Sequence, residues 1–309
     1  MKAPRTGGVR FAPSPTGHFH IGNLRTAWVS HQWARALQVP WVVRIEDIDQ
    51  PRVIPGVREH QLNDLQSLGL VPDILLTQSE FRDRHFELFR TAVLTRKAYP
   101  CDCSRKEVKA ALAAMASAPN DGHVPVYSGH CRSLSFQREF HAQDSIAWRF
   151  RMDDASGCND FIIARSSPVL GDDGLPVDKD SVAFAYHWAC AIDDFDGDYH
   201  LIVRSHDLAS ALPVQRAIQT WIGELEGEAR TPPAAFHTAL VVQNDGHRLE
   251  KRTQGVTLKE LLEHGINFGR VCDFFEKSFD PALLNSDVER SAVLGEAKET
   301  LRLEELFSV

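Results

Sequence analysis

The residues from Arg10 to Asn23 combine types and spacings that suit phosphate binding. The run RFAPSPTGHFHIGN holds two prolines, two glycines and two histidines, and its prolines force a turn between a short strand and a helix. A helix N-terminus exposes unpaired N–H groups and a partial positive charge, which attract phosphate. His18 and His20 can donate hydrogen bonds to phosphate oxygens, and Gly22 leaves room for a flat base against the backbone. Taken one at a time, these residues fit an ordinary strand-to-helix connection. The run as a whole favours a nucleotide site.

Charged residues at three expected strand ends suit a small diacid that also carries an amino group. Arg10 and Arg204 belong to strands far apart in the sequence, and Glu46 follows a third strand. The carboxyl ends of parallel strands meet at one edge of a sheet, so the three side chains can face one crevice. Arginine pairs with carboxylates, and an acidic side chain pairs with an ammonium group. By spacing alone, structural ion pairs explain these residues equally well.

Cysteines in the middle of the chain suggest a metal site. Cys101 and Cys103 are separated by one residue, and Cys131 follows in a polar segment with little apolar content. Zinc takes four ligands in a tetrahedron and binds thiolates well, and a segment with a small core needs such a staple. From chemistry alone, His130 or His123 would be the fourth ligand. The remaining cysteines, Cys158, Cys190 and Cys272, are expected to be buried or incidental.

The elements that position these residues alternate between strands and helices. This alternation is typical of a parallel sheet with covering helices. It breaks between residues 99 and 185, where short strands at 146–151 and 160–164 predict an insertion with its own architecture. From residue 258 we expect helices to the end, with an amphipathic segment near 301–307. The expected strands of the sheet are 9–12, 39–45, 199–203 and 236–242, and the expected helices are 21–37, 57–68, 81–97 and 213–224.

Length and composition narrow the classes of protein. The chain has 309 residues, of which 43% are hydrophobic and 25% charged, which is ordinary for a folded globular protein. Its net charge of -8 argues against a protein that binds nucleic acid over its entire surface. A local basic groove is still compatible with this charge. The sequence has no apolar run long enough for a spanning helix and no signal-peptide core, so we expect a cytoplasmic protein. Cysteines in that compartment favour free thiols or metal ligands over disulfides.

The run from Arg10 to Asn23 resembles the ATP-binding signature of class I aminoacyl-tRNA synthetases, in the form RFAPSPTGxxHxGN of the glutamyl branch. The resemblance covers residues 9 to about 255, through IEDIDQPR at 45–52, DFII at 160–163, DD at 193–194 and LIVR at 201–204. It implies a Rossmann-type α/β fold, ATP with Mg²⁺, L-glutamate and a tRNA. It also implies glutamate binding by Arg10, Ser14, Glu46, Tyr186 and Arg204, and ATP binding by His18, His20, Gly22 and Asn23.

A second stretch, Arg248 to Arg252, resembles the KMSKS or KLSKR loop of the same family. The lysines of that loop neutralise charge that builds up as pyrophosphate leaves. Lys251 matches the second lysine, Arg248 replaces the first, and Glu250 puts a carboxylate where the family has serine. The resemblance implies ATP binding by Arg248 and Lys251, and catalytic roles for Lys251, His20 and Gly22. We expect an active enzyme with a raised requirement for ATP. The family usually has glycine where this chain has Ser205.

The pattern Cys-x-Cys followed by Tyr-x-x-x-Cys resembles the zinc site of a short group of glutamyl-tRNA synthetase paralogues. It implies Cys101, Cys103, Tyr127 and Cys131 as ligands, with His130 in reserve. Few residues follow Arg252, whereas full-length synthetases continue with a helical domain that reads the anticodon. This resemblance, to the glutamyl-Q tRNA(Asp) synthetases, implies glutamate activation without tRNA. The glutamate is then joined to the queuosine base at the wobble position of tRNA(Asp), by a monomer that contacts the anticodon loop.

The resemblance divides the chain into four expected segments. Residues 1–98 and 186–254 form the two halves of the catalytic domain, 99–185 a zinc-binding insertion, and 255–309 a short helical C-terminal region without an anticodon-binding domain. Three alternatives remain. A truncated glutamyl-tRNA synthetase would charge a tRNA 3′ end, a zinc-containing RNA-binding paralogue would lack catalysis, and a nucleotidyltransferase of similar fold would use another substrate. Glu250 favours the second of these, while the set Arg10, Glu46 and Arg204 weighs against the third.

Overall fold

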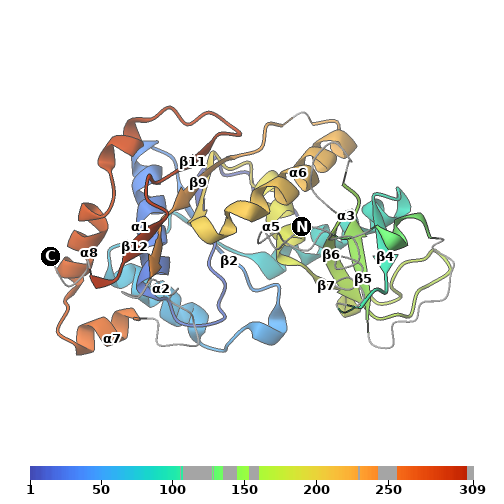
Figure 1. Cartoon of the computed structure of the whole chain (residues 1–309), viewed down its shortest axis with the longest axis horizontal. Helices are drawn as coiled ribbons and strands as arrows, with labels where there is room; N and C mark the ends of the chain where they lie inside the picture. Colours follow the sequence, from blue (N-terminus) through green and yellow to red (C-terminus); the bar gives the residue numbers. More distant parts are fainter. Residues whose placement is uncertain are drawn as a thin grey trace, which may run out of the picture. The chain divides into compact units, whose positions relative to one another are not determined.

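The computed structural model describes residues 1–104, 106, 127, 129–134, 145–152, 160–228, 230–242 and 256–304. The chain divides into two compact units (Figure 1). We call the first the sheet unit; it comprises Lys2–Phe81, Asp193–Leu212 and Gln219–Val309. We call the second the insertion unit; it comprises Arg82–Ile192 and Pro213–Ile218, with Met1. No helix among the described residues is long and apolar enough to cross a membrane.

The sheet unit is built on a six-stranded sheet in the order β11-β9-β8-β1-β2-β3. Each neighbouring pair in this sheet is parallel, as the alternation of strands and helices predicts. Of the four inner strands, β1 and β2 are buried along their whole length, whereas β11 at one edge is partly exposed. Burial on both faces explains why the inner strands are almost uniformly apolar. The strands are β1 (Val9–Phe11), β2 (Trp41–Ile45), β3 (Ile74–Thr77), β8 (Leu201–Ser205), β9 (Ala234–Thr238) and β11 (Val293–Gly295).

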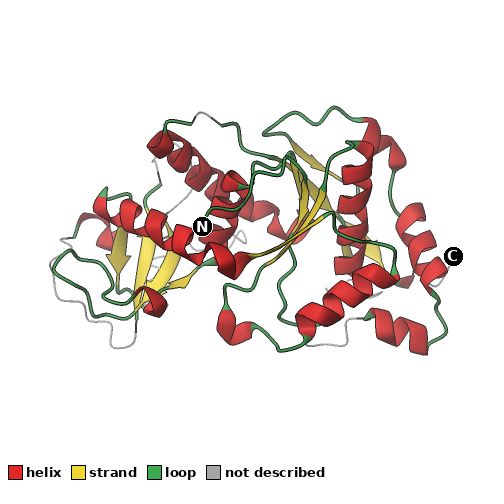
Figure 2. Cartoon of the chain, turned by 180° about the vertical axis from the view of Figure 1, so that it is seen from behind, coloured by secondary structure: helices red, strands yellow, loops and turns green. Residues whose placement is uncertain are grey.

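Helix α1 (Ile21–Ala36) covers this sheet and carries much of its core (Figure 2). Its Trp33 ring lies 5.3 Å from the ring of Phe236 on β9, and its Trp28 ring lies 6.1 Å from that of Phe275. Phe275 belongs to α8 (Phe268–Lys277), so the C-terminal part of the chain packs on the outer face of α1. The sheet unit also holds α2 (Val57–Ser67) and α7 (Leu258–Glu263), while the residues of α5 (Tyr186–Asp196) and α6 (Leu212–Glu226) are divided between the two units.

The insertion unit contains a four-stranded antiparallel sheet in the order β4-β5-β6-β7. The strands expected at 146–151 and 160–164 are confirmed as β5 and β6. Helix α3 (Arg82–Leu94) packs on this sheet, with the Phe89 ring 5.2 Å from that of Trp148 and edge-on to it. The strands are β4 (Ala98–Cys101), β5 (Ile146–Phe150), β6 (Phe161–Ser166) and β7 (Ala183–Phe184). Short 3₁₀ turns lie at Gln50–Arg52, Gln78–Phe81, His130–Ser133, Lys179–Ser181, His206–Ala211 and Pro281–Asn285.

The prediction of a helical chain from residue 258 to the end is wrong for residues 293–302. Two short strands lie there: β11, and β12 (Thr300–Arg302), which pairs with β10 (Leu240–Val242). Three-residue strands show too little periodicity to be found in a sequence, and partners elsewhere in the chain stabilise them. The strand expected at 236–242 is two strands, β9 and β10, which belong to different sheets and are separated by Ala239. Sequence reasoning also missed the edge strand β3.

Candidate active site

The strand order of the large sheet reverses direction between β1 and β8. Strands β2 and β3 lie on one side of β1 in the sheet, and β8, β9 and β11 lie on the other side. Ligands of open parallel sheets bind at the carboxyl ends of the strands where the order reverses in this way. Arg10 lies on β1, Glu46 directly follows β2, and Arg204 lies on β8. The three residues chosen from the sequence therefore flank this position.

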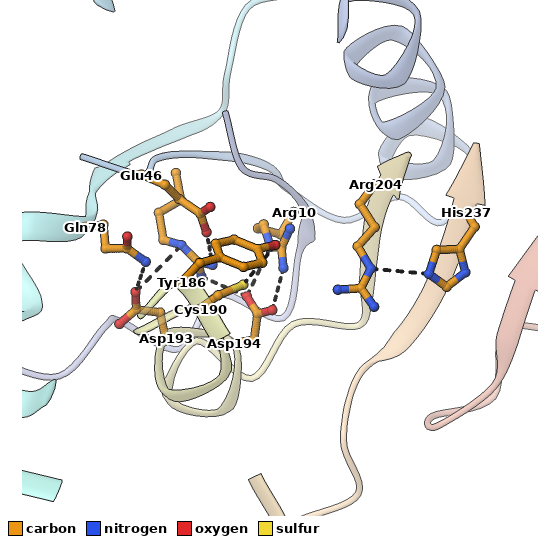
Figure 3. Close-up of polar contacts among 10 residues, drawn as sticks. Arg10, Glu46, Gln78, Tyr186, Cys190, Asp193, Asp194, Arg204 and His237 are labelled. Atoms are coloured by element: carbon orange, nitrogen blue, oxygen red, sulfur yellow. Dashed lines mark hydrogen bonds and ion pairs between the residues drawn. The ribbon is translucent and has the colours of Figure 1, made fainter. Parts of the chain in front are cut away.

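A buried ion-pair network joins two of these three residues (Figure 3). Arg10 donates to both carboxylate oxygens of Asp194, and its Nε lies 3.0 Å from Oδ1. Arg44 on β2 donates from Nη1 to Asp194 Oδ1 at 2.8 Å and from Nη2 to Glu46 Oε1 at 2.8 Å. Asp194 thus links β1 and β2 to helix α5. We call Arg10, Arg44, Glu46, Asp193 and Asp194 the charged network.

Sequence reasoning missed Arg44 and the role of Asp194 in this network. Arg44 is fully buried in the strand WVVRI, and a charged residue in an otherwise apolar strand is the signal that could have found it. Asp193 completes the network, because its Oδ2 accepts from Gln78 Nε2 at 2.8 Å and lies 3.8 Å from Arg44 Nε. Every one of these side chains is nine-tenths buried or more.

The charged network holds three carboxyl groups against two guanidinium groups, and the pKa values of Glu46 and Asp194 shift in opposite directions. Burial raises the pKa of Glu46 above its ordinary value, and the attraction of Arg44 and Arg10 offsets only part of that effect. Burial also opposes ionisation of Asp194, but Arg10 and Arg44 outweigh it and hold its pKa below the ordinary range. The fold therefore stabilises the charge of Asp194 and disfavours that of Glu46.

Arg204 is anchored separately, from the next strand. It lies opposite His237 of β9 in the strand register, and its Nε donates to His237 Nε2 at 3.3 Å. This contact makes Nε2 the acceptor of the imidazole, so the ring proton lies on Nδ1. Arg204 is 3% exposed. Figure 3 shows Arg204 and His237 on neighbouring strands, with the Arg204 side chain held toward the histidine.

The proline-rich turn after β1 is held from two sides. Gln61 of α2 is buried and donates from Nε2 to the carbonyl oxygens of Ser14, at 3.2 Å, and Gly17, at 2.8 Å. The backbone N–H of Glu46 donates to the Pro13 carbonyl at 2.8 Å. The turn, with Ser14, is therefore fixed to the residue that enters the charged network.

His20 is the N-cap of α1. Its Nδ1 accepts from the backbone N–H groups of Gly22, at 3.1 Å, and Asn23, at 3.3 Å. The Asn23 side chain accepts from the His20 N–H in return, which completes a capping box. Because Nδ1 is an acceptor, the ring proton lies on Nε2. A Cβ at Gly22 would lie 3.0 Å from His20 Cε1, so glycine leaves the room that this ring needs. Gly22 and Asn23 thus both serve to orient His20.

Residues on both sides of the second signature adjoin the start of α1. β10 ends at Val242, and its Val241 would lie 3.5 Å from a Cβ at Gly22. Past the signature, the Val256 carbonyl accepts from the Ile21 N–H at 3.0 Å, and Thr257 forms a β-bridge with His20. Arg248, Glu250 and Lys251 themselves lie outside the described residues.

Two further residues named from the sequence, His18 and Tyr186, make ring or hydroxyl contacts with neighbouring side chains. His18 is exposed, and its ring packs edge-on against that of His60 at 5.2 Å. Tyr186 begins α5 in the insertion unit, with its hydroxyl 3.7 Å from Cys190 Sγ.

The cysteines of the insertion unit form a compact cluster. The Sγ atoms of Cys101, Cys103 and Cys131 all lie within 4.8 Å of one another. The Tyr127 hydroxyl lies 3.4 Å from Cys101 Sγ and 3.8 Å from Cys103 Sγ, and it accepts from the Cys131 N–H at 2.9 Å. His130 is exposed. The cluster therefore contains the phenol that the family resemblance names. His123, the other histidine considered, lies outside the described residues, as does Cys158.

Arg149 of β5 contacts two members of this cluster, Cys101 and Tyr127. Its Nε donates to Cys101 Sγ at 3.3 Å, and its guanidinium carbon lies 3.6 Å from the centre of the Tyr127 ring. Its Nη1 donates to the Asp160 carbonyl at 3.1 Å, which fixes the orientation of the guanidinium. A hydrogen bond from Cys131, with others from Tyr127 and Arg149, lowers the pKa of Cys101 to about 4 although burial opposes ionisation. Sequence reasoning did not identify Arg149.

Comparisons with known proteins give the family. Residues 8–271 match the family described as "tRNA synthetases class I (E and Q), catalytic domain". The chain belongs to this family. The chain is 36% identical over 268 residues to the glutamyl-Q tRNA(Asp) synthetase of Deinococcus radiodurans, and the match covers 85% of each chain. It is 35% identical to that of Cutibacterium acnes, over 85% of this chain and 73% of the relative.

A solved structure shares the fold of this synthetase. A glutamate tRNA ligase from Elizabethkingia meningosepticum, in complex with its amino acid, superposes with a TM-score of 0.66 at 22% identity. The superposition covers 98% of this chain and 68% of the other. The family and the synthetase names of the relatives establish that the chain is a ligase-type enzyme.

Replacement of His20 separates its capping role from its imidazole chemistry. We expect His20→Ala to lower the free energy of unfolding by about 1 kcal/mol, because alanine leaves two N–H groups of α1 without an acceptor. His20→Asn keeps a capping oxygen and is expected to match the wild type within a few tenths of a kcal/mol. Urea unfolding of the three proteins measures both values, and equal losses in the two variants would contradict the capping role.

The two acids of the charged network are expected to differ in their effect on stability. Asp194→Asn at pH 7 leaves Arg10 and Arg44 buried without their shared carboxylate, which should lower the free energy of unfolding by roughly 3–5 kcal/mol. Glu46→Gln keeps an acceptor for Arg44 and removes a charge that the fold disfavours, so little loss or a gain is expected.

The pH dependence of these two variants follows from the directions of the pKa shifts. The pKa of Asp194 is lowered, so its stabilising effect is present above the ordinary value of 3.8 and is lost as the pH falls through the folded-state value. The pKa of Glu46 is raised, so ionisation of Glu46 opposes folding once the pH exceeds its ordinary value of 4.5. Any advantage of the Glu46→Gln variant over the wild type therefore shrinks as the pH falls. Unfolding curves between about pH 7 and pH 2 test both trends, because the effect of Asp194 is lost only below its ordinary value. A loss of stability in Glu46→Gln equal to that in Asp194→Asn would refute the assignment.

Proposed function

We propose that this synthetase activates L-glutamate with ATP, without tRNA, and then joins the glutamate to the queuosine base at the wobble position of tRNA(Asp). The relatives at 35–36% identity are named glutamyl-Q tRNA(Asp) synthetases, which supports the choice of substrates. The observation that carries the proposal is one strand–turn–helix unit. At one end Arg10 enters the charged network, and at the other His20 caps α1.

The glutamate site of this proposal consists of Arg10, Ser14, Glu46, Tyr186 and Arg204. Asp194 orients the Arg10 guanidinium and His237 orients that of Arg204, so little side-chain entropy is lost when they bind carboxylates. Glu46 is the proposed partner of the ammonium group, and a cationic ligand would favour the ionised form that burial disfavours. Ser14 is fixed by Gln61, while Tyr186 is proposed from the family resemblance alone.

The proposed nucleotide site is the N-terminus of α1. The positive end of the α1 dipole and the proton on His20 Nε2 suit phosphate oxygens, whereas the first N–H groups of the helix are already bonded to His20 Nδ1 and to the Val256 carbonyl. His18 and Asn23 belong to the same turn, and Arg248 and Lys251 are proposed to bind the departing phosphates with Mg²⁺. The described residues before and after this stretch, Val241 and Val256, both adjoin the start of α1. This supports the assignment of Arg248 and Lys251 to the nucleotide site.

The proposed chemistry needs no nucleophile from the protein. A carboxylate oxygen of glutamate attacks the α-phosphorus of ATP, the bond to the bridging oxygen breaks, and pyrophosphate leaves with the negative charge. Positioned cations offset that charge, as in other phosphoryl transfers. A hydroxyl of the queuosine ring then attacks the activated carbonyl carbon, an ester forms, and AMP leaves. Rate enhancement in both steps comes from positioning and electrostatics.

The insertion unit is proposed to hold a structural zinc ion. Three thiol sulfurs within 4.8 Å of one another, with a phenol oxygen 3.4 Å from Cys101 Sγ, are a donor set that suits a tetrahedral zinc site. When bound, the ion would tie the end of β4, which carries Cys101, to the 3₁₀ turn that carries Cys131. Cys101, Cys103, Tyr127 and Cys131 are the proposed ligands, in preference to the exposed His130.

Three assays together test the proposed function. Glutamate-dependent exchange of labelled pyrophosphate into ATP should proceed without tRNA and should fall at least tenfold in Lys251→Ala and in the stably capped His20→Asn, since each removes a positioned donor. Labelled glutamate should then be transferred to tRNA from cells that make queuosine and not to tRNA from cells that lack it. Removal of the terminal adenosine of the tRNA should leave the transfer intact.

The alternatives give different outcomes in the same assays. Transfer that requires the terminal adenosine and ignores queuosine would identify a truncated synthetase that charges the 3′ end. A complete absence of exchange in the wild type would instead indicate an RNA-binding paralogue. Unchanged exchange in Lys251→Ala would remove the assignment of the second signature.

Metal analysis tests the zinc site and the role of Arg149. We expect one zinc per chain, and chelation should lower the melting temperature. Tyr127→Phe and Arg149→Met should each weaken zinc binding by about 10–100-fold, because one loses an oxygen donor and the other the support of that donor. His130→Ala is the matched control and should retain wild-type affinity in competition with a chromophoric chelator. A loss of zinc in His130→Ala with none in Tyr127→Phe would reverse the choice of ligand.

A further inference from the structure

The first turns of α1 are tied to the corner between β9 and β10 by several short contacts. The Thr26 hydroxyl lies 2.9 Å from that of Thr238, the last residue of β9, and 3.0 Å from the Gly22 carbonyl, to which it donates. Gly22 itself packs close to Val241 of β10. The helix that begins at His20 therefore has a defined position against this corner.

Glu296, from the C-terminal part of the chain, is the acceptor at the centre of this contact. Arg25 of α1 donates from Nη1 to Glu296 Oε2 at 2.7 Å and from Nη2 to Oε1 at 2.5 Å. The backbone N–H of Ala239, between β9 and β10, donates to the same Oε2 at 2.5 Å. The Arg25 side chain is 1% exposed and that of Glu296 is 7% exposed. One buried carboxylate thus joins the helix and the corner.

The backbone of residues 293–302 places Glu296 at this point. β11 pairs with β9, with Gly295 opposite His237, and the Glu296 N–H donates to the His237 carbonyl at 3.2 Å. β12 then pairs with β10, and the Leu240 N–H donates to the Glu299 carbonyl at 2.7 Å. Glu296 therefore lies where the segment passes from one sheet to the other, directly against Ala239. The guanidinium of Arg25 is held on its other side by Ser278, the C-cap of α8.

We propose that Glu296 is a positioning residue for nucleotide binding, acting through Arg25 and Ala239 on the orientation of the α1 N-terminus. The inference rests on the proposed function in one respect: it takes the His20 turn as the place where ATP binds. A carboxylate can accept from both guanidinium nitrogens and from the backbone N–H at once, whereas an amide has one acceptor oxygen and would set an NH₂ against these donors. Loss of the carboxylate therefore leaves the second turn of the helix tied to the corner by the Thr26–Thr238 hydroxyl contact without the charged contact.

The geometry also predicts which substrate is affected. Arg25 and Thr26 lie one turn beyond His20 on the same helix, so movement of α1 displaces the capped end. Arg10 and Glu46 are instead fixed by Asp194 and Arg44. Arg204 is held by His237, and the bond from Glu296 to the His237 carbonyl comes from its backbone N–H, which a side-chain replacement keeps. A change at Glu296 should weaken ATP binding and leave glutamate binding largely unchanged.

Glu296→Gln tests the inference against Glu299→Gln as a matched control on the same segment. The Glu299 side chain is 75% exposed, with His206 at 3.5 Å. In the pyrophosphate exchange assay we expect the KM for ATP to rise about fivefold in Glu296→Gln, the lower end of typical coupling between linked sites, with the KM for glutamate within about twofold of wild type. Glu299→Gln should keep both values. Calorimetric titration with ATP and Mg²⁺ alone should show the same loss of affinity in Glu296→Gln.

A double variant separates positioning from general destabilisation. Arg25→Gln with Glu296→Gln removes both buried charges, so its melting temperature should recover relative to Glu296→Gln, while its KM for ATP should stay raised. It also carries the test if Glu296→Gln alone fails to fold. An equal rise in both KM values, or a wild-type KM for ATP in the double variant, would overturn the inference. If the wild type binds ATP in calorimetry but shows no exchange, the proposed function fails, and the calorimetric affinities still decide the role of Glu296.

Discussion

The buried pairing of Asp194 with Arg10 and Arg44 is the interaction on which the candidate site depends. It connects two neighbouring strands of the sheet to a helix that lies far away in the sequence. Burial of so many ionisable groups is unfavourable unless each is paired with an opposite charge. Removal of one member leaves the others buried without a partner. The guanidinium groups are consequently fixed in place before any ligand arrives. A site that must discriminate between a carboxylate and an amide gains from such preorganisation, because its cations cannot move aside to accept the wrong group.

The same network keeps one group in an unfavourable state. The fold lowers the pKa of Asp194 but raises that of Glu46, although the two carboxyl groups share Arg44 as a neighbour. A residue whose charged form is disfavoured contributes little to stability at neutral pH, so its presence is better explained by a ligand than by folding. An ammonium group beside Glu46 would reverse the balance. Folding thus favours the charged form of Asp194 and disfavours that of Glu46, whereas the proposed function needs Glu46 to be charged.

In the insertion unit, thiols and an aromatic ring form a cluster at the end of β4. Tyr127 reaches the thiols of Cys101 and Cys103, while Arg149 stacks on its ring and donates to Cys101. Three thiolates and a phenolate around one divalent ion would carry excess negative charge, which a buried guanidinium offsets. This support would allow Tyr127 to serve in the proposed zinc site, where cysteine or histidine is the usual ligand.

The sequence by itself determined what depends on local order: the alternation of strands and helices, the turn from Arg10 to Asn23 and the positions of the cysteines. These features follow from periodicity, proline and glycine placement, and short spacings, which need no knowledge of distant partners. Only the tertiary structure decided that Arg10 pairs with Asp194, 184 residues away, that Arg44 bridges it to Glu46, and that Glu296 meets Arg25 and Ala239. Those pairings depend on strand order and on which segments share a sheet edge, and short strands such as β3, β11 and β12 acquire their structure from neighbours that no local pattern names.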